Sequence, residues 1–446
     1  MRVPRAPVAR DLLVELYRAA VAAAAPGPAL WPRLQQLELE PERRIWILAL
    51  GKAALPMASA AIQVLGTRGR DPAGGLVVAP EGNPSPDSRL TFVQGDHPEP
   101  GPGSLAAAEA LGAVVSRIGP DDEAWVLLSG GTTSLIGAPE PGLAQTDLKS
   151  IYTLLLGSGL DITTMNTIRK RFSRWGGGKL ARALAPARVR VYIVSDVIGD
   201  DLSSIGSGPC VPDHAMASEV RALLERAALW SRIPEAGRRF VASAESGKTP
   251  ETPKAGEGAF ERVALEVVAS NSLALKAAAQ RAAELGLSPR VAETPLAGEA
   301  AEAGARVARS LLNDCVQLST PQPPPTCLIW GGETTVSLGE GPAGMGGRSQ
   351  ELALAAARTL AATDAAALLA AGTDGRDGPT DAAGAIIDGN TWSAIAERGR
   401  NPGQDLARHN AYPALDSVGA LLRPGLTGTN VMDIVIGICL GKGVSE

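Results

Sequence analysis

Aromatic residues, paired cysteines and long apolar runs are all scarce in this chain of 446 residues. Aromatic residues make up 3% of the sequence, which we attribute to compositional drift. None of the four cysteines forms a CxxC pair, which speaks against a zinc site and against a disulfide framework. The apolar stretch at residues 12–25 is interrupted by Glu15 and Arg18, so neither a signal peptide nor a membrane-spanning helix is expected there. We therefore expect a cytoplasmic protein.

The chain has no overall positive charge that would attract a polyanionic partner. The formal net charge is −5, with 45% hydrophobic and 20% charged residues, which is ordinary for a soluble globular enzyme. Binding to nucleic acid or to an anionic membrane is not expected, so a bound anion would need local positive charge. At this length the chain should form two or three domains.

Short apolar runs typical of strands alternate with helix-like runs along the whole chain. Strands are expected at residues 44–50, 75–78, 90–93, 124–128, 189–194, 262–269, 327–330, 365–371 and 434–440. Their continuous apolar character indicates burial on both faces, which favours parallel α/β layers. Residues 245–258 are rich in Gly, Pro, Lys and Glu, and are expected to be a linker.

Several predicted strands end in small or acidic residues. These ends are Ser129–Ser134, Ser195-Asp196, Gly331–Glu333 and Gly372–Asp374. Ligands bind beyond the carboxyl ends of strands in open parallel sheets. One glycine pair after a strand is usually a tight turn, but several together with carboxylates favour a binding site.

The stretch Ile329–Val336, followed by Gly346–Glu351, is the most informative of these. It predicts a strand, a glycine loop with a carboxylate and two hydroxyls, then Arg348 at the start of a helix. Glycines let backbone N–H groups approach a phosphate, and a helix N-terminus adds a favourable dipole. Arginine is the side chain best shaped for carboxylate or phosphate.

A second positive charge, Lys52, follows the predicted strand at residues 44–50. A lysine gains nothing from the dipole at a helix N-terminus, and its small neighbours leave room for an anion. The loop Ser129–Ser134 offers backbone amides and hydroxyls that suit polyphosphate. Neither segment is a Walker A loop or a dinucleotide fingerprint.

Clustered aspartates in two glycine loops suit Mg²⁺, which takes one or two carboxylates together with substrate phosphates. We favour a functional role for Asp196 and Asp374, because both stand at strand ends. Structural roles in Asx-turns and N-caps are favoured for the others, Asp200, Asp201, Asp377 and Asp381. Of the three histidines, only His97 could line a site, and no G-x-S-x-G motif supports a Ser-His-Asp hydrolase.

Taken together, these loops resemble the glycerate 2-kinase family, whose chains combine a DUF4147 domain with a C-terminal MOFRL domain. The resemblance covers most of the chain, and the ordered matches make it specific although each is weak alone. The motifs are Ala49-Leu-Gly-Lys-Ala-Ala54, Leu128-Ser-Gly-Gly131, Asn166-Thr-Ile-Arg-Lys170, Ser195-Asp-Val-Ile-Gly-Asp200, Ser207-Gly-Pro209, Gly331-Gly-Glu-Thr-Thr335, Gly346-Gly-Arg348, Gln350-Glu351, Gly372-Thr-Asp-Gly375, Asp377-Gly-Pro-Thr-Asp381 and Thr427-Gly-Thr-Asn430.

The resemblance implies two α/β domains with the site in the cleft between them. We assign a Rossmann-like parallel-sheet domain to residues 1–250 and a smaller α/β MOFRL domain to residues 260–446. It also implies transfer of the ATP γ-phosphoryl group to the 2-hydroxyl of D-glycerate with Mg²⁺, giving 2-phosphoglycerate and ADP. A homodimer is the expected assembly, should the protein form an oligomer.

On this resemblance, Lys52 and Arg348 are the main charged catalytic residues. Asp196 would bind Mg²⁺ or accept the hydroxyl proton, with Glu333 as a second metal ligand. The nucleotide-binding residues would be Ser129, Gly130, Gly131, Thr132, Thr133, Asn271, Gly332 and Asp374.

The sequence departs from the family at several positions. Thr132 and Thr133 replace a glycine-serine pair, so β-carbons are expected where phosphate approaches. The family usually has asparagine at the position of Ser349 and threonine at the position of Cys210. It also usually has a lysine near the position of Gly176. These departures leave open the rate of the phosphoryl transfer and the identity of the acceptor.

Two other functions compete with the kinase. A hydroxypyruvate reductase would act on the related three-carbon acid, but no G-x-G-x-x-G directly follows a predicted strand. A non-catalytic protein that binds a nucleotide or hydroxy acid would explain the substituted loops.

Overall fold

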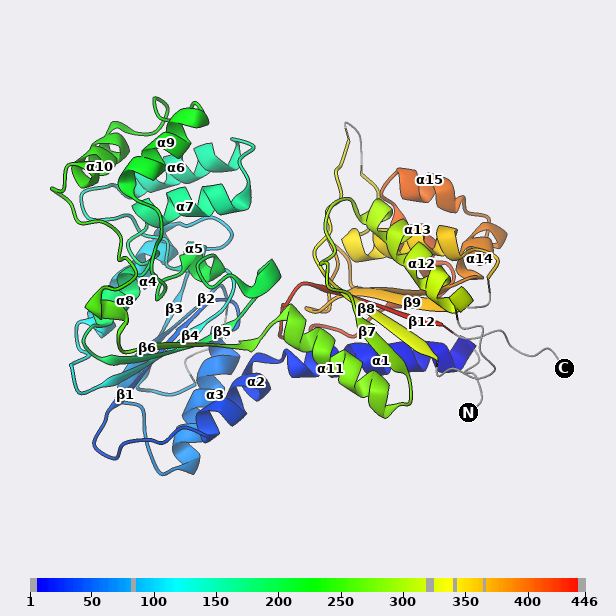
Figure 1. Ribbon diagram of the computed structural model, residues 1–446, viewed down its shortest axis with the longest axis horizontal. Coiled ribbons are helices and arrows are strands. Elements are labelled where there is room, and N and C mark those ends of the chain that lie inside the picture. The colour runs from blue at the N-terminus through cyan, green and yellow to red at the C-terminus, as the bar shows by residue number, and fades with distance from the viewer. Residues whose placement is uncertain (1–5, 82–85, 318–324, 340–342, 364–365, 440–446) are drawn as a thin grey trace. The chain divides into compact units, whose positions relative to one another are not determined.

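The computed structural model describes residues 6–81, 86–317, 325–339, 343–363 and 366–439 (Figure 1). The chain divides into two compact units. The N-terminal unit comprises residues 26–268, and the C-terminal unit comprises residues 1–25 together with 269–446. Each unit is described by itself.

The N-terminal unit is built on a six-stranded parallel sheet with the order β3-β2-β1-β4-β5-β6. Its strands are β1 (Ile45–Leu50), β2 (Gly74–Ala79), β3 (Leu90–Gln94), β4 (Glu123–Leu128), β5 (Arg188–Val194) and β6 (Val263–Ala269). This is the doubly wound order in which ligands bind at the carboxyl ends of the strands. Leu50 is in register with Val78 and with Leu128, so the loops after these strands leave the sheet at one level. The predicted Rossmann-like sheet is confirmed.

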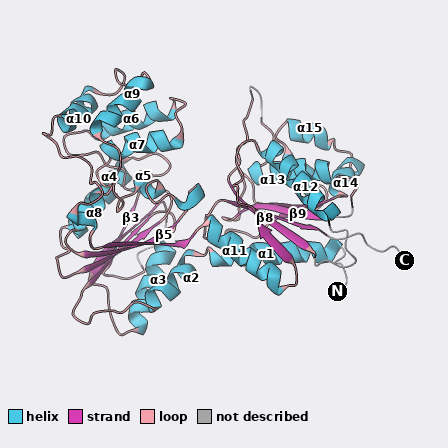
Figure 2. Cartoon of the chain, viewed as in Figure 1, coloured by secondary structure: helices cyan, strands magenta, loops and turns pink. Residues whose placement is uncertain are grey.

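Helices cover both faces of this sheet, and a helical subregion extends from it (Figure 2). α2 (Pro26–Gln35) packs on α3 (Ala54–Thr67), and α3 packs on one face of the sheet. α4 (Pro102–Val115) and α8 (Lys179–Leu184) pack on the other face. A separate apolar core joins α6 (Gln145–Leu156), α7 (Ile162–Phe172), α9 (Ala217–Arg226) and α10 (Glu235–Glu245). The short helices are α5 (Thr132–Leu135), η1 (Ile198–Asp200), η2 (Ile205–Ser207) and η3 (Gly258–Phe260).

The C-terminal unit contains a mixed six-stranded sheet with the order β11-β10-β9-β12-β8-β7. Its strands are β7 (Ser288–Val291), β8 (Thr326–Gly332), β9 (Ala366–Gly372), β10 (Gly384–Asp388), β11 (Leu421–Leu422) and β12 (Asp433–Cys439). One face is covered by α1 (Ala6–Ala23) and α11 (Asn271–Glu284), the other by α12 (Ala300–Gln317) and α13 (Arg348–Leu360). α14 (Thr391–Glu397), α15 (Pro402–Ala407) and α16 (Ala411–Asp416) pack around α13.

The expectation of parallel strands was wrong for the C-terminal sheet. β12 lies antiparallel between β8 and β9, and β10 is antiparallel to β9. The prediction of burial was correct, because β8, β9 and β12 are buried along their whole length. Helices on both faces bury a strand whichever way it runs, so apolar character did not fix its direction. The predicted strand residues 365 and 440 lie outside the described residues.

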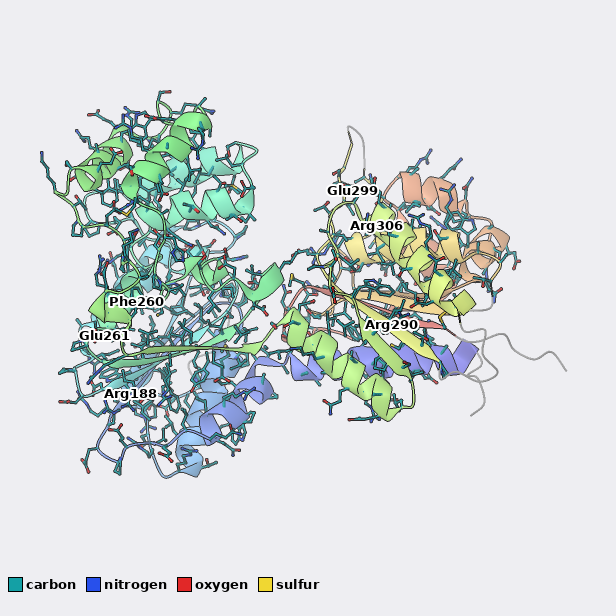
Figure 3. All side chains as sticks on the ribbon, viewed as in Figure 1. Arg188, Phe260, Glu261, Arg290, Glu299 and Arg306 are labelled. Carbon is teal, nitrogen blue, oxygen red and sulfur yellow. A yellow bond between two sulfur atoms is a disulfide. The ribbon has the colours of Figure 1, made fainter. Side chains whose placement is uncertain are left out.

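The predicted linker at residues 245–258 was also wrong, because this segment packs into the N-terminal unit. Thr252 is buried and donates a hydrogen bond to Asp213 (2.8 Å), and Glu251 pairs with Arg171. Just beyond it, Phe260, labelled in Figure 3, packs against Gly178. Most of the Glu and Lys residues that suggested an exposed linker are held by ion pairs or hydrogen bonds, namely Glu245, Glu251, Lys254 and Glu257.

The two compact units have bounds that differ from those of the predicted domains, 1–250 and 260–446. They differ at the start of the chain and at the boundary between the two units. α1 belongs to the C-terminal unit, where the Tyr17 hydroxyl donates to the Gly372 carbonyl (2.7 Å). Glu15 on the same helix pairs with Arg281 of α11 (2.5 Å). The N-terminal unit continues through β6.

A disulfide joins Cys315, on α12, to Cys439, at the end of β12. The two residues are 124 positions apart in the sequence, so spacing could not predict the pair. Cys210 and Cys327 are buried free thiols. No helix within the described ranges is long and apolar enough to cross a membrane.

Candidate active site

In the N-terminal unit, the turns after β1 and β4 lie backbone against backbone. Gly51 has a φ of +121°, and a Cβ there would lie 2.5 Å from the Ser129 carbonyl oxygen. The Lys52 N–H donates to the Gly130 carbonyl (3.0 Å). Only glycine fits at position 51, because its φ is left-handed and the neighbouring turn leaves no room for a side chain. This contact places Lys52 beside the loop that begins at Ser129.

The hydroxyls of that loop are largely committed to the protein itself. Ser129 Oγ accepts a hydrogen bond from the Ala53 N–H (2.9 Å), and Thr132 Oγ1 donates to the Leu50 carbonyl (2.9 Å). Thr133 Oγ1 is bonded to Ser207 Oγ (2.9 Å). The Ser129 N–H is committed too, since it donates to the Leu50 carbonyl (3.0 Å). What Thr132 can offer a phosphate is its backbone N–H, at the start of α5.

This geometry corrects one expectation about the substituted threonines. Thr132 is fully buried, with its side chain directed toward Gly206 and Leu50. Its β-carbon therefore does not lie where a phosphate would approach the loop. Ser349, the substitution beside Arg348, is buried as well, and it is not among the residues that line a pocket next to Arg348 in the C-terminal unit.

Gly131 brings Lys52 and His97 together. A Cβ at Gly131 would lie 3.3 Å from Lys52 Cγ and 3.1 Å from His97 Cδ2. Lys52 is exposed, and within the described residues it makes no ion pair. Burial, with a smaller contribution from the Lys52 charge, lowers the pKa of His97 below its usual value. His97 is therefore neutral at pH 7, and Lys52 is the positive charge of this loop.

Asp196, which follows β5, lies against the same loop. A Cβ at Gly130 would overlap the Asp196 carboxylate, so the absence of a side chain at Gly130 lets the carboxylate approach the loop backbone. The fold thus brings together four of the predicted residues, Lys52, Gly130, Gly131 and Asp196.

The C-terminal unit has a pocket of about 590 Å³ in which most of its predicted residues meet. The polar and charged lining residues are Glu333, Arg348, Glu351, Asp374, Arg376, Asp377, His409 and Asn430. Arg348 begins α13 and is held by carboxylates. Its Nε donates to Asp433 Oδ2 (2.6 Å), its Nη2 to Asp433 Oδ1 (3.1 Å), and its Nη1 to Glu333.

Asp433 was not predicted as a site residue. It is the first residue of β12 and is buried, and it is in register with Gly332 of β8 and Gly372 of β9. Because β12 runs antiparallel, its start lies at the edge where β8 and β9 end. Burial raises the pKa of Asp433, while the Arg348 guanidinium opposes the shift. The bidentate pair fixes the plane of the guanidinium.

Asp377 caps the N-terminus of α13, as its predicted structural role requires. Its carboxylate accepts hydrogen bonds from the Ser349 N–H (3.2 Å) and the Gln350 N–H (2.7 Å). Burial raises its pKa to about 7, against the effect of these N–H groups. The Asx-turn expected at Asp201 is confirmed too, since it accepts from the Ser203 N–H (3.0 Å).

The other predicted residues of this unit mainly shape the pocket. The Asn271 amide donates to the carbonyls of Val431 (2.8 Å) and Asp433 (3.1 Å), so it anchors the start of β12. Gly332 has a φ of +139° and lies against the backbone of Leu296. Asp374 lines the pocket and accepts from the Arg376 N–H (3.0 Å).

A histidine that the sequence analysis set aside also lines this pocket. His409 Nδ1 lies 2.9 Å from Glu351 Oε2. Burial raises the pKa of Glu351, with the contact to His409 opposing the shift. No local pattern links the two residues, because they are 58 positions apart.

The chain as described contains no group of three or more His, Cys, Asp or Glu side chains arranged to hold a metal ion. Asp196 and Glu333 lie in different units, and the Glu333 carboxylate is engaged by Arg348. Roles in metal binding for either residue stay predictions.

Comparisons with known proteins agree with this architecture. Residues 12–242 match the family described as a domain of unknown function (DUF4147), and residues 326–433 match the MOFRL family. The chain is 38% identical over 409 residues to glycerate 2-kinase of Pyrococcus horikoshii, covering 92% of this chain and 90% of that protein. It is 37% identical over 426 residues to a protein of Agrobacterium vitis provisionally named hydroxypyruvate reductase, covering 96% and 93%. The crystal structure of glycerate kinase from Thermotoga maritima has a TM-score of 0.88 at 34% identity, covering 97% of this chain and 99% of that chain.

The fold and its loops define a two-unit α/β protein with a parallel N-terminal sheet and a mixed C-terminal sheet. With matches along nearly its whole length, the chain belongs to the glycerate 2-kinase family of DUF4147 and MOFRL architecture.

Proposed function

We propose that this protein transfers the γ-phosphoryl group of ATP to the 2-hydroxyl of D-glycerate, giving 2-phosphoglycerate and ADP. The observation that carries the proposal is the N-terminal loop, where an exposed lysine, a glycine pair and a carboxylate lie together, and where Lys52 makes no ion pair with any residue that the structure describes. The relatives named as glycerate kinases supply the acceptor.

Phosphoryl transfer depends chiefly on positioning and on neutralising charge, and these residues suit both tasks. Lys52 would bind a phosphate or the glycerate carboxylate, and the amides at Gly130 and Gly131 would bind nucleotide phosphates. Arg348, with its guanidinium fixed by Asp433, would bind the other anionic group. Asp196 would either hold the metal or accept the proton of the 2-hydroxyl.

The residues fit Mg²⁺ as the metal. Mg²⁺ needs only one or two carboxylates when substrate phosphates and water supply the other ligands, so a larger carboxylate cluster is not required. Asp196, against the glycine loop, is placed to be such a carboxylate. When bound, the ion would neutralise charge on the phosphates.

A hydroxypyruvate reductase is the second candidate, favoured by the provisional name of the Agrobacterium vitis relative. The chain has no G-x-G-x-x-G motif after β1, and the β1 turn is instead filled by its contact with the Ser129 loop.

An assay that separates the two follows ADP formation with D-glycerate, ATP and Mg²⁺, and in parallel the oxidation of NADH and NADPH with hydroxypyruvate. We expect ADP formation that requires D-glycerate and stops in excess chelator, with no oxidation of either cofactor. Reductase activity without ADP formation would replace the proposal with the second candidate. Binding of ATP without either reaction would favour a non-catalytic protein.

A further inference from the structure

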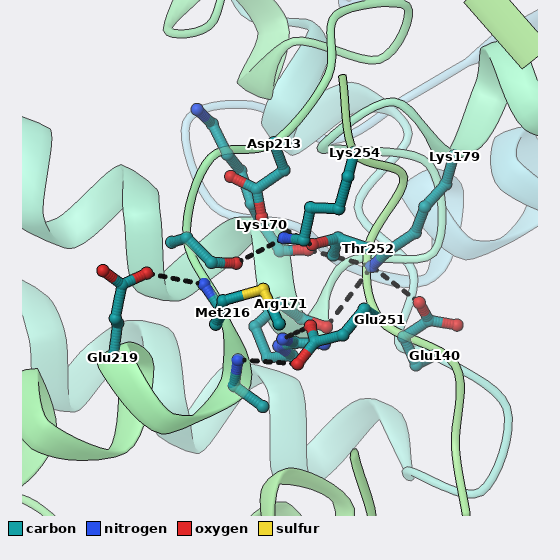
Figure 4. Close-up of polar contacts among 12 residues, drawn as sticks. Glu140, Lys170, Arg171, Lys179, Asp213, Met216, Glu219, Glu251, Thr252 and Lys254 are labelled. Atoms are coloured by element: carbon teal, nitrogen blue, oxygen red, sulfur yellow. Dashed lines mark hydrogen bonds and ion pairs between the residues drawn. The ribbon is translucent and has the colours of Figure 1, made fainter. Parts of the chain in front are cut away.

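A second group of charged side chains lies in the N-terminal unit around the end of α7 (Figure 4). It contains four cationic residues, Lys170, Arg171, Lys179 and Lys254. It contains three well-buried or half-buried carboxylates, Glu140, Asp213 and Glu251.

Two of the cations have protein carboxylates as partners. Arg171 pairs with Glu251, and Lys179 Nζ lies 2.6 Å from Glu140. Lys179 also donates to the carbonyls of Lys170 (2.9 Å) and Ser173 (2.5 Å), so it caps the C-terminus of α7. These are structural roles.

A third cation is satisfied by hydrogen bonds. Lys254 Nζ donates to the Ala215 carbonyl (2.6 Å) and to Thr252 Oγ1 (2.9 Å). Thr252 in turn donates to Asp213 Oδ2 (2.8 Å). Lys254 and Asp213 therefore belong to one bonded chain.

Lys170 is the exception. The residue is 7% exposed, yet in the described chain its ammonium makes no hydrogen bond and no ion pair within 4.0 Å, and no dashed line reaches it in Figure 4. The carboxylates that act on it from longer range are Asp213 and Asp201, and Asp201 is bonded to the hydroxyls of two serines. Lys170 Nζ is not among the fully buried polar atoms that lack a hydrogen bond in the described chain, so the ammonium is open to solvent and an anion can reach it.

The position of Lys170 connects it to the predicted nucleotide loop. A Cβ at Gly177 would lie 3.4 Å from Lys170 Cβ, and the Gly177 N–H donates to the Ser207 carbonyl (2.8 Å). Ser207 Oγ is bonded to Thr133 Oγ1 (2.9 Å). Three contacts in series, through Gly177 and Ser207, therefore join the β-carbon of Lys170 to Thr133.

We propose that Lys170 is an anion-binding residue, whose ammonium contacts a carboxylate or phosphate group of a substrate. The inference deepens the proposed function and rests on it for the identity of that substrate. The binding itself does not depend on turnover, so it can be tested separately.

The alternative is a structural lysine, stabilised by the C-terminal dipole of α7 and by Asp213. The two readings differ in the sign of a stability change. Removing an ammonium that bonds to no protein group should leave the protein as stable or more stable, whereas removing a bonded one should destabilise it. Lys254 is the matched bonded residue in the same group.

The experiment compares the thermal unfolding of wild type, Lys170→Met, Lys254→Met and Lys149→Met, where Lys149 is an exposed lysine on α6. Tm is measured with sodium phosphate or sodium D-glycerate, and with sodium chloride at the same ionic strength. An anion bound only by the folded state raises Tm. The anion that raises the wild-type Tm shows whether phosphate or carboxylate is the ligand.

We expect Lys170→Met to keep or raise the Tm in chloride and to lose the anion-specific increase, weakening anion affinity about tenfold or more. Lys149→Met should keep the increase, and Lys254→Met should lower the Tm in chloride. An undiminished increase in Lys170→Met would overturn the inference, as would a wild type that responds to neither anion. A Lys170→Met variant that fails to fold would also overturn it, because the ammonium would then be structural. If anion binding requires Lys170 but no ADP forms, the proposed function fails and this inference stands.

Discussion

The two units present their principal cations in opposite ways. Lys52 of the N-terminal unit is exposed beside a glycine loop, with no ion pair in the described chain. Arg348 of the C-terminal unit is held by Asp433 and Glu333, with its side chain 34% exposed. A lysine on a flexible stem can follow a moving phosphoryl group, whereas a clamped guanidinium holds a planar anion in one orientation. We therefore expect a substitution of Lys52 to reduce catalysis without reducing stability, and a substitution of Arg348 to reduce both.

The largest effect is expected on catalysis. Lys52→Met and Arg348→Met should each lower kcat/KM for D-glycerate by about 10²- to 10³-fold, because each removes a charge aimed at the transferring or substrate anion. Steady-state ADP formation measures this. Lys149→Met and Arg309→Met, at exposed positions, are the controls. Wild-type turnover by either site variant would remove that residue from the site.

The next effect separates the two cations by stability. Arg348→Met should lower the free energy of unfolding by about 2 kcal/mol, because Asp433 is left buried without its partner. The loss is smaller than for a fully buried ion pair, because the Arg348 side chain is partly exposed. Lys52→Met should change stability by less than about 0.5 kcal/mol. Urea unfolding measures both. A double variant, Arg348→Met with Asp433→Asn, should recover part of the loss, and equal losses at Lys52 and Arg348 would refute the comparison.

A smaller, pH-dependent effect is expected at Asp377. Its pKa in the folded state is about 7 against an ordinary value of 3.8, so between these values the folded state binds one more proton than the unfolded state. Stability from this group is therefore present at low pH and is lost as pH rises toward 7. In Asp377→Asn the fall in unfolding free energy between pH 5 and pH 8 should be smaller, and in exposed Asp381→Asn unchanged. An identical pH dependence in Asp377→Asn and wild type would show that the carboxyl ionises normally.

The smallest effect is expected at His97. Because its pKa is lowered, it is already neutral at pH 7, so His97→Gln should leave the pH profile of kcat/KM above pH 7 unchanged. A pH-rate profile of the variant checks this. A lost titration step in that range would make His97, rather than Asp196, the proton acceptor to examine.

The sequence predicted best where one short segment determines the geometry. The turns at Gly51-Lys52 and Gly130-Gly131 follow apolar strands directly, so their place at the sheet edge could be inferred from the parallel pattern. Asp433 could not be inferred in this way, because its place depends on β12 entering the sheet antiparallel between two distant strands.

Three other features escaped prediction for related reasons. The Cys315–Cys439 disulfide and the His409–Glu351 contact join positions far apart in the chain. Residues 245–258 have the composition of a linker, but composition does not reveal that Arg171 pairs with Glu251 and that Asp213 accepts a hydrogen bond from Thr252. Long-range pairing, more than local propensity, decided each of these cases.

The most direct test of the proposed reaction is ³¹P NMR of the product after incubation of the protein with D-glycerate, ATP and Mg²⁺. The proposal predicts a 2-phosphoglycerate signal that grows with the ADP signals and that grows about 10²-fold or more slowly in Lys52→Met. A 3-phosphoglycerate signal would keep the kinase and contradict the acceptor hydroxyl. No phosphorylated glycerate, from a protein that is folded and binds ATP, would contradict the proposed function.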